Sequence, residues 1–341
     1  MIASVPDLLR LLALPVLAWA AWRDVEIRRV PGRTWLPLAA LGVVLLVWDG
    51  ANALAAGGLD LVLFAVGTAI SLLVVVPAAY LFWRFGAFGG ADAKALIVLA
   101  VLFPTFPVYD VGAVTVPLRT TPTGAFALTI LSNTVLVGAC YPLWLALHNA
   151  VAGRFTPLMA VGRPVAWDEL PRTHGRLLEG RSGFVRSGLD LDALRMYLRW
   201  RGETLAELRG DPDRYRRPDS LPAEPLPAGD GAVATGGESP AASELRSDGA
   251  GRTDRERPSS GSGGLRSASD DWGADAFLTD VGSAYGTTPE GLREGLELLT
   301  TRDRAWVSPG IPFLVPILVG LAIGLTYGDL LIAALGAVGL V

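Results

Sequence analysis

The sequence predicts an all-α polytopic membrane protein with about six transmembrane helices and a small cytoplasmic subdomain that a disordered linker interrupts. Three observations lead to this fold class. Hydrophobic residues make up 51% of the 341 residues and the mean hydropathy is +0.42, which are values too high for an ordinary soluble domain. Several uncharged runs reach the roughly 20 residues that a helix needs to cross a bilayer. One long central stretch is instead rich in arginine, glycine and proline.

Six apolar runs are the candidate spanning helices. Three of them contain no charged residue, namely 61–83, 124–151 and 311–328. The runs 8–22 and 35–48 are weaker candidates, and Arg10 interrupts the first of them. The run 95–109 contains two prolines, so we expect it to span only with a kink or in a thinned bilayer. The terminal run 330–341 is too short to cross alone and is predicted to be re-entrant or interfacial.

Arginine placement predicts the orientation of this bundle in the cell membrane. The loops after the first and third runs contain the basic residues Arg23, Arg28, Arg29, Arg33, Arg84 and Lys94. By contrast, the loop 49–60 has no basic residue and the loop 105–123 has only Arg119. Basic loops remain in the cytoplasm. We therefore expect the amino terminus outside, and the two basic loops and the arginine-rich stretch 154–304 inside.

These signals divide the chain into five parts. Residues 1–153 form a membrane bundle of five helices, and residues 306–341 form the last membrane helix with an apolar tail. Residues 154–216 and 270–305 are predicted cytoplasmic helical segments. Their signals are a stripe of Leu191, Leu194 and Leu198 and a helix N-cap at Thr288. Residues 217–269 have almost no large apolar side chains to offset the entropy of ordering, so they are predicted to be a disordered linker.

The sequence offers few residues for metal or thiol chemistry. It has one cysteine, Cys140, and two histidines, His148 and His174, which lie far apart. A single cysteine excludes a disulfide within the chain, a four-cysteine zinc site and a CxxC redox motif. We therefore expect neither a metal nor another cofactor.

Two aspartates lie on the predicted cytoplasmic side of the membrane. Asp24 comes just after the first apolar run, and Asp92 lies in a glycine-rich turn before the fourth. Two carboxylates that face each other at one depth tend to share a proton near neutral pH, a state that suits acid–base hydrolysis of a peptide bond. Gly89 and Gly90 would let an extended substrate strand approach the carboxylates closely.

The residue pattern alone leaves three functions open. These are a membrane peptidase, a proton- or ion-coupled transporter that uses the carboxylates as relay sites, and a non-enzymatic assembly platform. A transporter should show paired broken helices in two corresponding halves, and no such halves are visible in the sequence. An aspartate beside arginines in a cytoplasmic loop is usually solvated and structural, which is the alternative interpretation of Asp24. We interpret Asp60, Asp110 and Asp329, which also lie near membrane ends, as loop residues.

Three segments resemble those of a known family. Gly89-Gly90-Ala91-Asp92-Ala93-Lys94 resembles the GxGDxK signature of the membrane aspartic peptidases that process type IV prepilins and archaeal preflagellins. Asp24, with Arg28 and Val30-Pro31-Gly32 after it, is similar to that family's first aspartate and its downstream Arg and Ile-Pro-Asn element. Pro312-Phe313 is similar to the entrance of the family's last membrane helix. Ala91 and Gly32 depart from the pattern, since the family has glycine and asparagine there.

The resemblance implies an aspartic endopeptidase of the prepilin and preflagellin type, with Asp24 and Asp92 as the catalytic pair at the cytoplasmic membrane face. The motif and substrate loop would comprise Gly89, Gly90, Ala91, Lys94, Arg28 and Pro31. The enzyme would remove the short basic leader of pilin-like or archaellin precursors, in contact with membrane lipid and with no nucleic acid. The single cysteine fits the archaeal, peptidase-only type. The sequence carries no signal for the oligomeric state, nor for the role of Lys94, which is the only lysine among 29 Lys and Arg residues.

Overall fold

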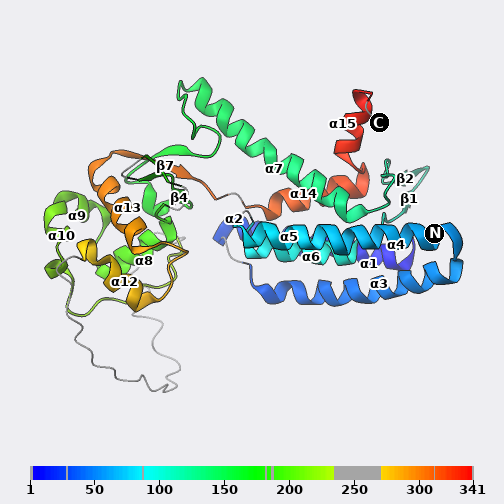
Figure 1. Ribbon diagram of the computed structural model, residues 1–341, viewed down its shortest axis with the longest axis horizontal. Coiled ribbons are helices and arrows are strands. Elements are labelled where there is room, and N and C mark those ends of the chain that lie inside the picture. Colours follow the sequence, from blue (N-terminus) through cyan, green and yellow to red (C-terminus); the bar gives the residue numbers. More distant parts are fainter. Residues whose placement is uncertain are drawn as a thin grey trace, which may run out of the picture. The chain divides into compact units, whose positions relative to one another are not determined.

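The computed structural model describes residues 3–27, 30–86, 88–180, 183–185, 188–233, 270–310 and 312–339 (Figure 1). The chain divides into two compact units. The membrane unit comprises Met1–Leu143 and Ile311–Val341, and the polar unit comprises Trp144–Gly310. Helices dominate the described part of both units.

The membrane unit consists of helices joined by short turns, with one small hairpin (Figure 1). Its helices are α1 (Val5–Arg10), α2 (Ala13–Ile27), α3 (Leu36–Ala56), α4 (Gly58–Ile70), α5 (Val76–Arg84), α6 (Gly90–Leu102), α7 (Phe126–Val151), α14 (Leu314–Thr326) and α15 (Leu330–Ala337). A 3-10 turn, η1 (Gly32–Trp35), precedes α3, and a π-helical turn, η2 (Ser71–Val75), joins α4 to α5. The hairpin pairs β1 (Tyr109–Val111) with β2 (Val114–Val116). The last residues of α7 belong to the polar unit.

Four stretches of the described residues are long and apolar enough to cross a membrane. They are Val5–Glu26, Gly32–Ala56, Gly58–Arg84 and Phe126–Val151. The other two predicted spans contain only the 13-residue helices α6 and α14. At 1.5 Å per residue each is about 20 Å long, against a hydrocarbon core of about 30 Å. The structure thus supports a polytopic membrane protein with four candidate spans, and the predicted number of six is not confirmed.

The short helix α6 is enclosed by its neighbours. It packs against α3 and α5, and α14 packs against both α2 and α6 (Figure 1). Its buried side chains include Ala95, Leu96, Leu99 and Leu102. Because the apolar side chains of α6 are covered on several sides, packing fixes the position of its first turn, which carries Asp92.

Arg10 is buried at the opposite end of α6. Its guanidinium donates hydrogen bonds to Asp7 Oδ1 (2.6 Å), to the carboxylate of Asp49 and to the carbonyl oxygen of Leu102 (2.8 Å). These contacts join α1, the second half of α3 and the last residue of α6. Since Leu102 lies about 15 Å along the helix from Asp92, this ionic cluster is remote from the glycine-rich turn.

The polar unit combines helices with small antiparallel sheets (Figure 1). Its helices are α8 (Leu191–Arg201), α9 (Leu205–Gly210), α10 (Pro212–Arg216), α12 (Ala274–Val281) and α13 (Pro289–Thr301). Its strands are β3 (Arg163–Ala166), β4 (Arg176–Leu177), β5 (Glu179–Gly180), β6 (Gly183–Phe184) and β7 (Arg304–Ser308). The strand β7 lies between β3 and β4, and β5 pairs with β6. The all-α prediction is therefore too simple here, because strands of two to five residues are too short to show an alternating pattern.

Residues before and after the segment 234–269 form one hydrophobic core. Tyr197 of α8 lies against Phe277 of α12 with ring centroids 5.5 Å apart, and its hydroxyl donates to the carbonyl of Trp272 (2.6 Å). The predicted N-cap is confirmed, since the Thr288 side chain accepts the Gly291 N–H (3.1 Å) at the start of α13. The two predicted helical segments are thus parts of one unit.

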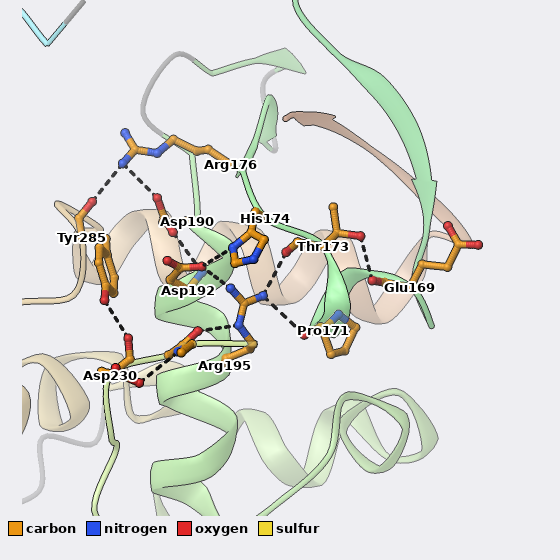
Figure 2. Close-up of polar contacts among 12 residues, drawn as sticks. Glu169, Pro171, Thr173, His174, Arg176, Asp190, Asp192, Arg195, Asp230 and Tyr285 are labelled. Carbon is orange, nitrogen blue, oxygen red and sulfur yellow. Dashed lines mark hydrogen bonds and ion pairs between the residues drawn. The ribbon is translucent and has the colours of Figure 1, made fainter. Parts of the chain in front are cut away.

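Arg195 holds two loops against α8 by binding their backbone carbonyls (Figure 2). Its Nε donates to the Gly231 carbonyl (2.6 Å), and one terminal nitrogen donates to the Thr173 carbonyl (2.9 Å). The Tyr285 hydroxyl donates to the Asp230 carbonyl (2.6 Å), which fixes the same loop from another side. A guanidinium has five donors in a fixed plane, so a single side chain can tie several loops together.

The first part of the predicted linker 217–269 is packed on the polar unit. The described part of that stretch, residues 217–233, packs on the polar unit, and the Leu226 N–H donates to the carbonyl of Trp200 (2.9 Å). Residues 234–269 lie outside the described residues, so the linker there stays a prediction.

Candidate active site

Asp92 lies in the first turn of α6 and is 9% exposed. Its Oδ2 accepts the Gly89 N–H at 3.0 Å, which caps the helix. A methyl group on Gly89 would lie 2.9 Å from that same oxygen, although the backbone of Gly89 (φ −66°) would accept any residue. A side chain at position 89 would therefore displace the Asp92 carboxylate.

The loop before Asp92 is fixed by aromatic contacts. Gly86 takes a left-handed conformation (φ +72°) just after α5, which favours glycine. Phe88 then lies between Phe82 and Phe313, with ring centroids 5.0 and 4.7 Å away. Such pairs stabilise by about 1 kcal/mol beyond their buried area. The glycine-rich turn is thereby attached to the residue that precedes α14.

Asp24 lies on the face of α2 that is turned toward the bundle. The residues of α2 that are almost fully buried are Ala13, Leu17, Ala20 and Ala21. Asp24 follows Ala20 by four positions and Ala21 by three, so it continues this stripe by one helical turn. Its side chain is half-buried, and α2 packs against α14. This position differs from that of a fully solvated loop aspartate.

The turn after α2 contacts the first turns of α6. Pro31 is the N-cap residue of η1, and η1 packs on α6. A methyl group on Gly32 would lie 2.9 Å from Lys94 Nζ, so the ammonium lies directly over this glycine. The C-terminal end of α2 and the N-terminal end of α6 therefore lie at the same end of the membrane unit.

The remaining predicted site residues are placed as follows. Ala91, which departs from the motif, is helical and packs on the membrane core, so the α-helix accommodates its methyl group. Gly90 lies near Trp83, whose Nε1 would be 3.6 Å from an added methyl group. Arg28 lies outside the described residues. No cluster that could hold a metal ion occurs within the described part of the chain.

The segments that carry Asp24, Asp92 and Phe313 are thus assembled in one unit by α14, η1 and the Phe88 ring. Residues 11–156 match the model of the type IV leader peptidase family. Over these residues the chain is similar to the type IV leader peptidase family. Both aspartates lie within the matched range, and α14 lies outside it. No curated protein matches the chain.

This match to the type IV leader peptidase family supports a protease function for the membrane unit. It also indicates type IV pilin-like precursors as the class of substrate. The transporter alternative gains no support from this match.

Two polar clusters of this peptidase were missed by sequence reasoning. One is the buried Arg10 cluster, whose partners are 39 and 92 residues away in the chain. The other surrounds Asp329, which was interpreted as a loop residue but is 4% exposed and accepts hydrogen bonds from Thr129 (2.9 Å) and Ser132 (3.1 Å). Asp329 also caps α15 through the Ile332 N–H. An aspartate directly before an apolar run was the available signal for this cap.

Proposed function

We propose that this protein is an aspartic endopeptidase that removes the short basic leader from type IV pilin-like precursors, with Asp24 and Asp92 as its catalytic pair. The observation that best supports this proposal is the placement of both aspartates at one end of the membrane unit. Asp24 extends the buried stripe of α2, and Asp92 is held by Gly89 in the first turn of α6. The contact of Lys94 with Gly32 joins these two segments.

In the proposed reaction the two carboxyl groups share one proton. The ionised carboxylate takes a proton from a water molecule, which attacks the scissile carbonyl carbon, while the protonated carboxyl donates to the carbonyl oxygen. The carboxyl that gained the water proton then gives it to the leaving nitrogen, and the C–N bond breaks. The other carboxylate recovers a proton from a hydroxyl of the intermediate. The apparent pKa values of such a pair belong to both groups together.

The surroundings of the two aspartates support cleavage at a membrane interface. Trp22 and Trp83 are exposed close to Asp24 and Gly90, and tryptophan is enriched where lipid meets water. The turn that contains Gly86, Gly89 and Gly90 has little side-chain bulk, so an extended strand could reach the carboxylates. The basic loops assign this interface to the cytoplasm. We propose that the basic leader stays there while the hydrophobic helix of the precursor remains in the bilayer.

Cleavage of a tagged precursor by purified enzyme in detergent or liposomes tests the proposal. We expect Asp24→Asn and Asp92→Asn each to lower the cleavage rate about a thousandfold, within the range that acid–base groups contribute. Asp60→Asn is the matched control, because Asp60 is an exposed aspartate at the start of α4. We expect this variant enzyme to cleave the precursor at the normal rate. Normal cleavage by either catalytic-site variant would overturn the proposal.

The substrate range needs a separate measurement. We propose that the natural precursors are archaellins, adhesion pilins or the precursors of sugar-binding proteins, all of which carry a basic leader before an apolar helix. A panel of these precursors, each with and without its basic leader residues, would rank them by kcat/KM. Equal cleavage with and without the basic residues would contradict leader recognition.

A further inference from the structure

The ammonium of Lys94 lies over Gly32, a residue without a side chain. Its Nζ would be 2.9 Å from a methyl group on Gly32, and its Cε would be 3.9 Å away. Among the described residues, no other atom would lie within 4 Å of that methyl group. Gly32 does not have a positive φ angle, so alanine would cause no backbone strain. A side chain at position 32 would therefore have to displace the Lys94 ammonium.

The position of this contact connects the two halves of the proposed site. Lys94 follows Asp92 by two residues on α6, and Gly32 follows Asp24 by eight residues in the turn after α2. Residues two apart on a helix do not face each other, so Lys94 is directed away from the Asp92 carboxylate. It extends to the segment that follows the other aspartate.

We propose that Lys94 is a positioning residue, whose ammonium packs on the Gly32 backbone and fixes the turn after α2 against the start of α6. This inference rests on the proposed function, because it assigns Lys94 to the alignment of Asp24 with Asp92. A displacement of about 1 Å between reacting groups can lower a rate about a hundredfold. A contact that joins the two segments outside the reacting atoms is therefore sufficient to affect the chemical step.

The geometry also accounts for lysine in a chain whose other basic residues are all arginine. A compact ammonium can approach a glycine backbone, whereas a planar guanidinium is wider and binds best to a matching planar acceptor. A cation in the first turns of a helix also gains nothing from the helix dipole, which favours anions there. Retention of lysine is explained by its fit over Gly32.

A double-mutant cycle in the full-length enzyme tests this contact. We expect Gly32→Ala to lower kcat about tenfold with little change in KM, since alignment and not substrate binding is disturbed. In the Lys94→Ala background the same substitution should cause no further loss, because the atoms that it would meet are gone. Gly50→Ala is the matched control, since its methyl group would only touch the Phe64 ring at 3.6 Å. Equal effects of Gly32→Ala in both backgrounds would overturn the proposal.

A second measurement does not depend on cleavage. Lys94 is the only lysine, so an amine-reactive ester modifies only this side chain and the terminal amine. Lys94 is exposed, so the reagent also reaches it in the parent protein. We expect Gly32→Ala to change the acylation rate of Lys94, because the methyl group displaces the ammonium from the Gly32 backbone, whereas Gly50→Ala should not change it. An unchanged rate in Gly32→Ala would refute the contact even if the aspartate variants behave as expected. If the aspartate variants still cleave, the proposed function fails, and the acylation rates still report on the contact.

Discussion

The two ends of the membrane unit use aspartates in different ways. At one end, Asp7 and Asp49 bind the buried guanidinium of Arg10, which joins three helices. At the other end, Asp92 is held by a backbone N–H in a turn made of glycines, and Asp24 lies at the end of a buried stripe on a different helix. A carboxylate at a membrane end therefore does not identify a site by itself.

The largest predicted difference is between the effects of Asp92→Asn at one end of the membrane unit and Arg10→Leu at the other end. Asp92→Asn should lower cleavage about a thousandfold without lowering thermal stability. Arg10→Leu should lower the free energy of unfolding by about 3 kcal/mol, because it deprives two partly buried carboxylates of their cation. The cleavage activity of Arg10→Leu per folded molecule should remain close to normal. Thermal unfolding and precursor cleavage of both variants measure this contrast, and a loss of stability in Asp92→Asn would contradict it.

The next largest effect is expected at Gly89. Gly89→Ala would place a methyl group 2.9 Å from Asp92 Oδ2 and push the carboxylate out of position. We expect cleavage to fall about a hundredfold. Gly50→Ala is the matched control, because its methyl group would make an ordinary 3.6 Å contact with the Phe64 ring outside the site. Similar activities of the two variants would show that position 89 needs glycine for another reason.

A smaller effect is predicted for the charge at Lys94. Lys94→Arg should keep part of the cleavage activity, because a cation remains near Gly32. Lys94→Glu should lose more, because it replaces the cation over Gly32 by an anion. The kcat values of both variants test this order, and equal values would mean that the charge has no role.

The polar unit provides a carboxylate of a third kind. Burial raises the pKa of Asp190 above its ordinary value of 3.8, although the Asp192 N–H and Arg176 act in the opposite direction. The folded state therefore binds a proton more readily than the unfolded state, and the stability of the unit should fall as the pH rises from 3.8 through the raised pKa.

Asp190→Asn tests this pH dependence. Asparagine is also a good N-cap, so the start of α8 should persist while the pH dependence becomes weaker. Hydrogen exchange of the α8 amides as a function of pH measures the effect. An unchanged slope would contradict the assignment to Asp190.

The smallest expected effect is that of removing residues 234–269. Their composition offers little apolar surface for a core. Replacing them by a short glycine–serine linker should leave stability and cleavage unchanged, because Arg195 and Arg293 bind the chain on either side. Loss of cleavage in this deletion variant would assign the segment a role at the site.

Local signals predicted the features that depend on a few adjacent residues. The glycine-rich turn before Asp92, the leucine stripe of α8 and the Thr288 cap are all of this kind. Contacts between distant residues could not be predicted in the same way. Arg10 was seen only as an interruption of an apolar run, because nothing in its own segment indicates a partner such as Asp49.

Composition was also misleading in the polar unit. Residues 217–233 resemble a linker because they contain few large apolar side chains. They are nevertheless held in place, since Arg195 binds the backbone carbonyl of Gly231 (Figure 2). Every residue has such a carbonyl, so the composition does not indicate this contact. The pairing of β3 with β7 joins residues about 140 positions apart, which no local pattern encodes. The predicted number of six spans is not confirmed, since α6 ends at Leu102, just before the prolines of its run, and is shorter than a spanning helix.

The separation of the Asp24 and Asp92 carboxylates tests the central claim most directly. It can be measured in an experimental structure of the enzyme with a non-cleavable pilin-like precursor bound. Our account predicts carboxylate oxygens within direct or one-water hydrogen-bond reach of each other and of the scissile carbonyl. Carboxylates that remain farther apart with the precursor bound would contradict it.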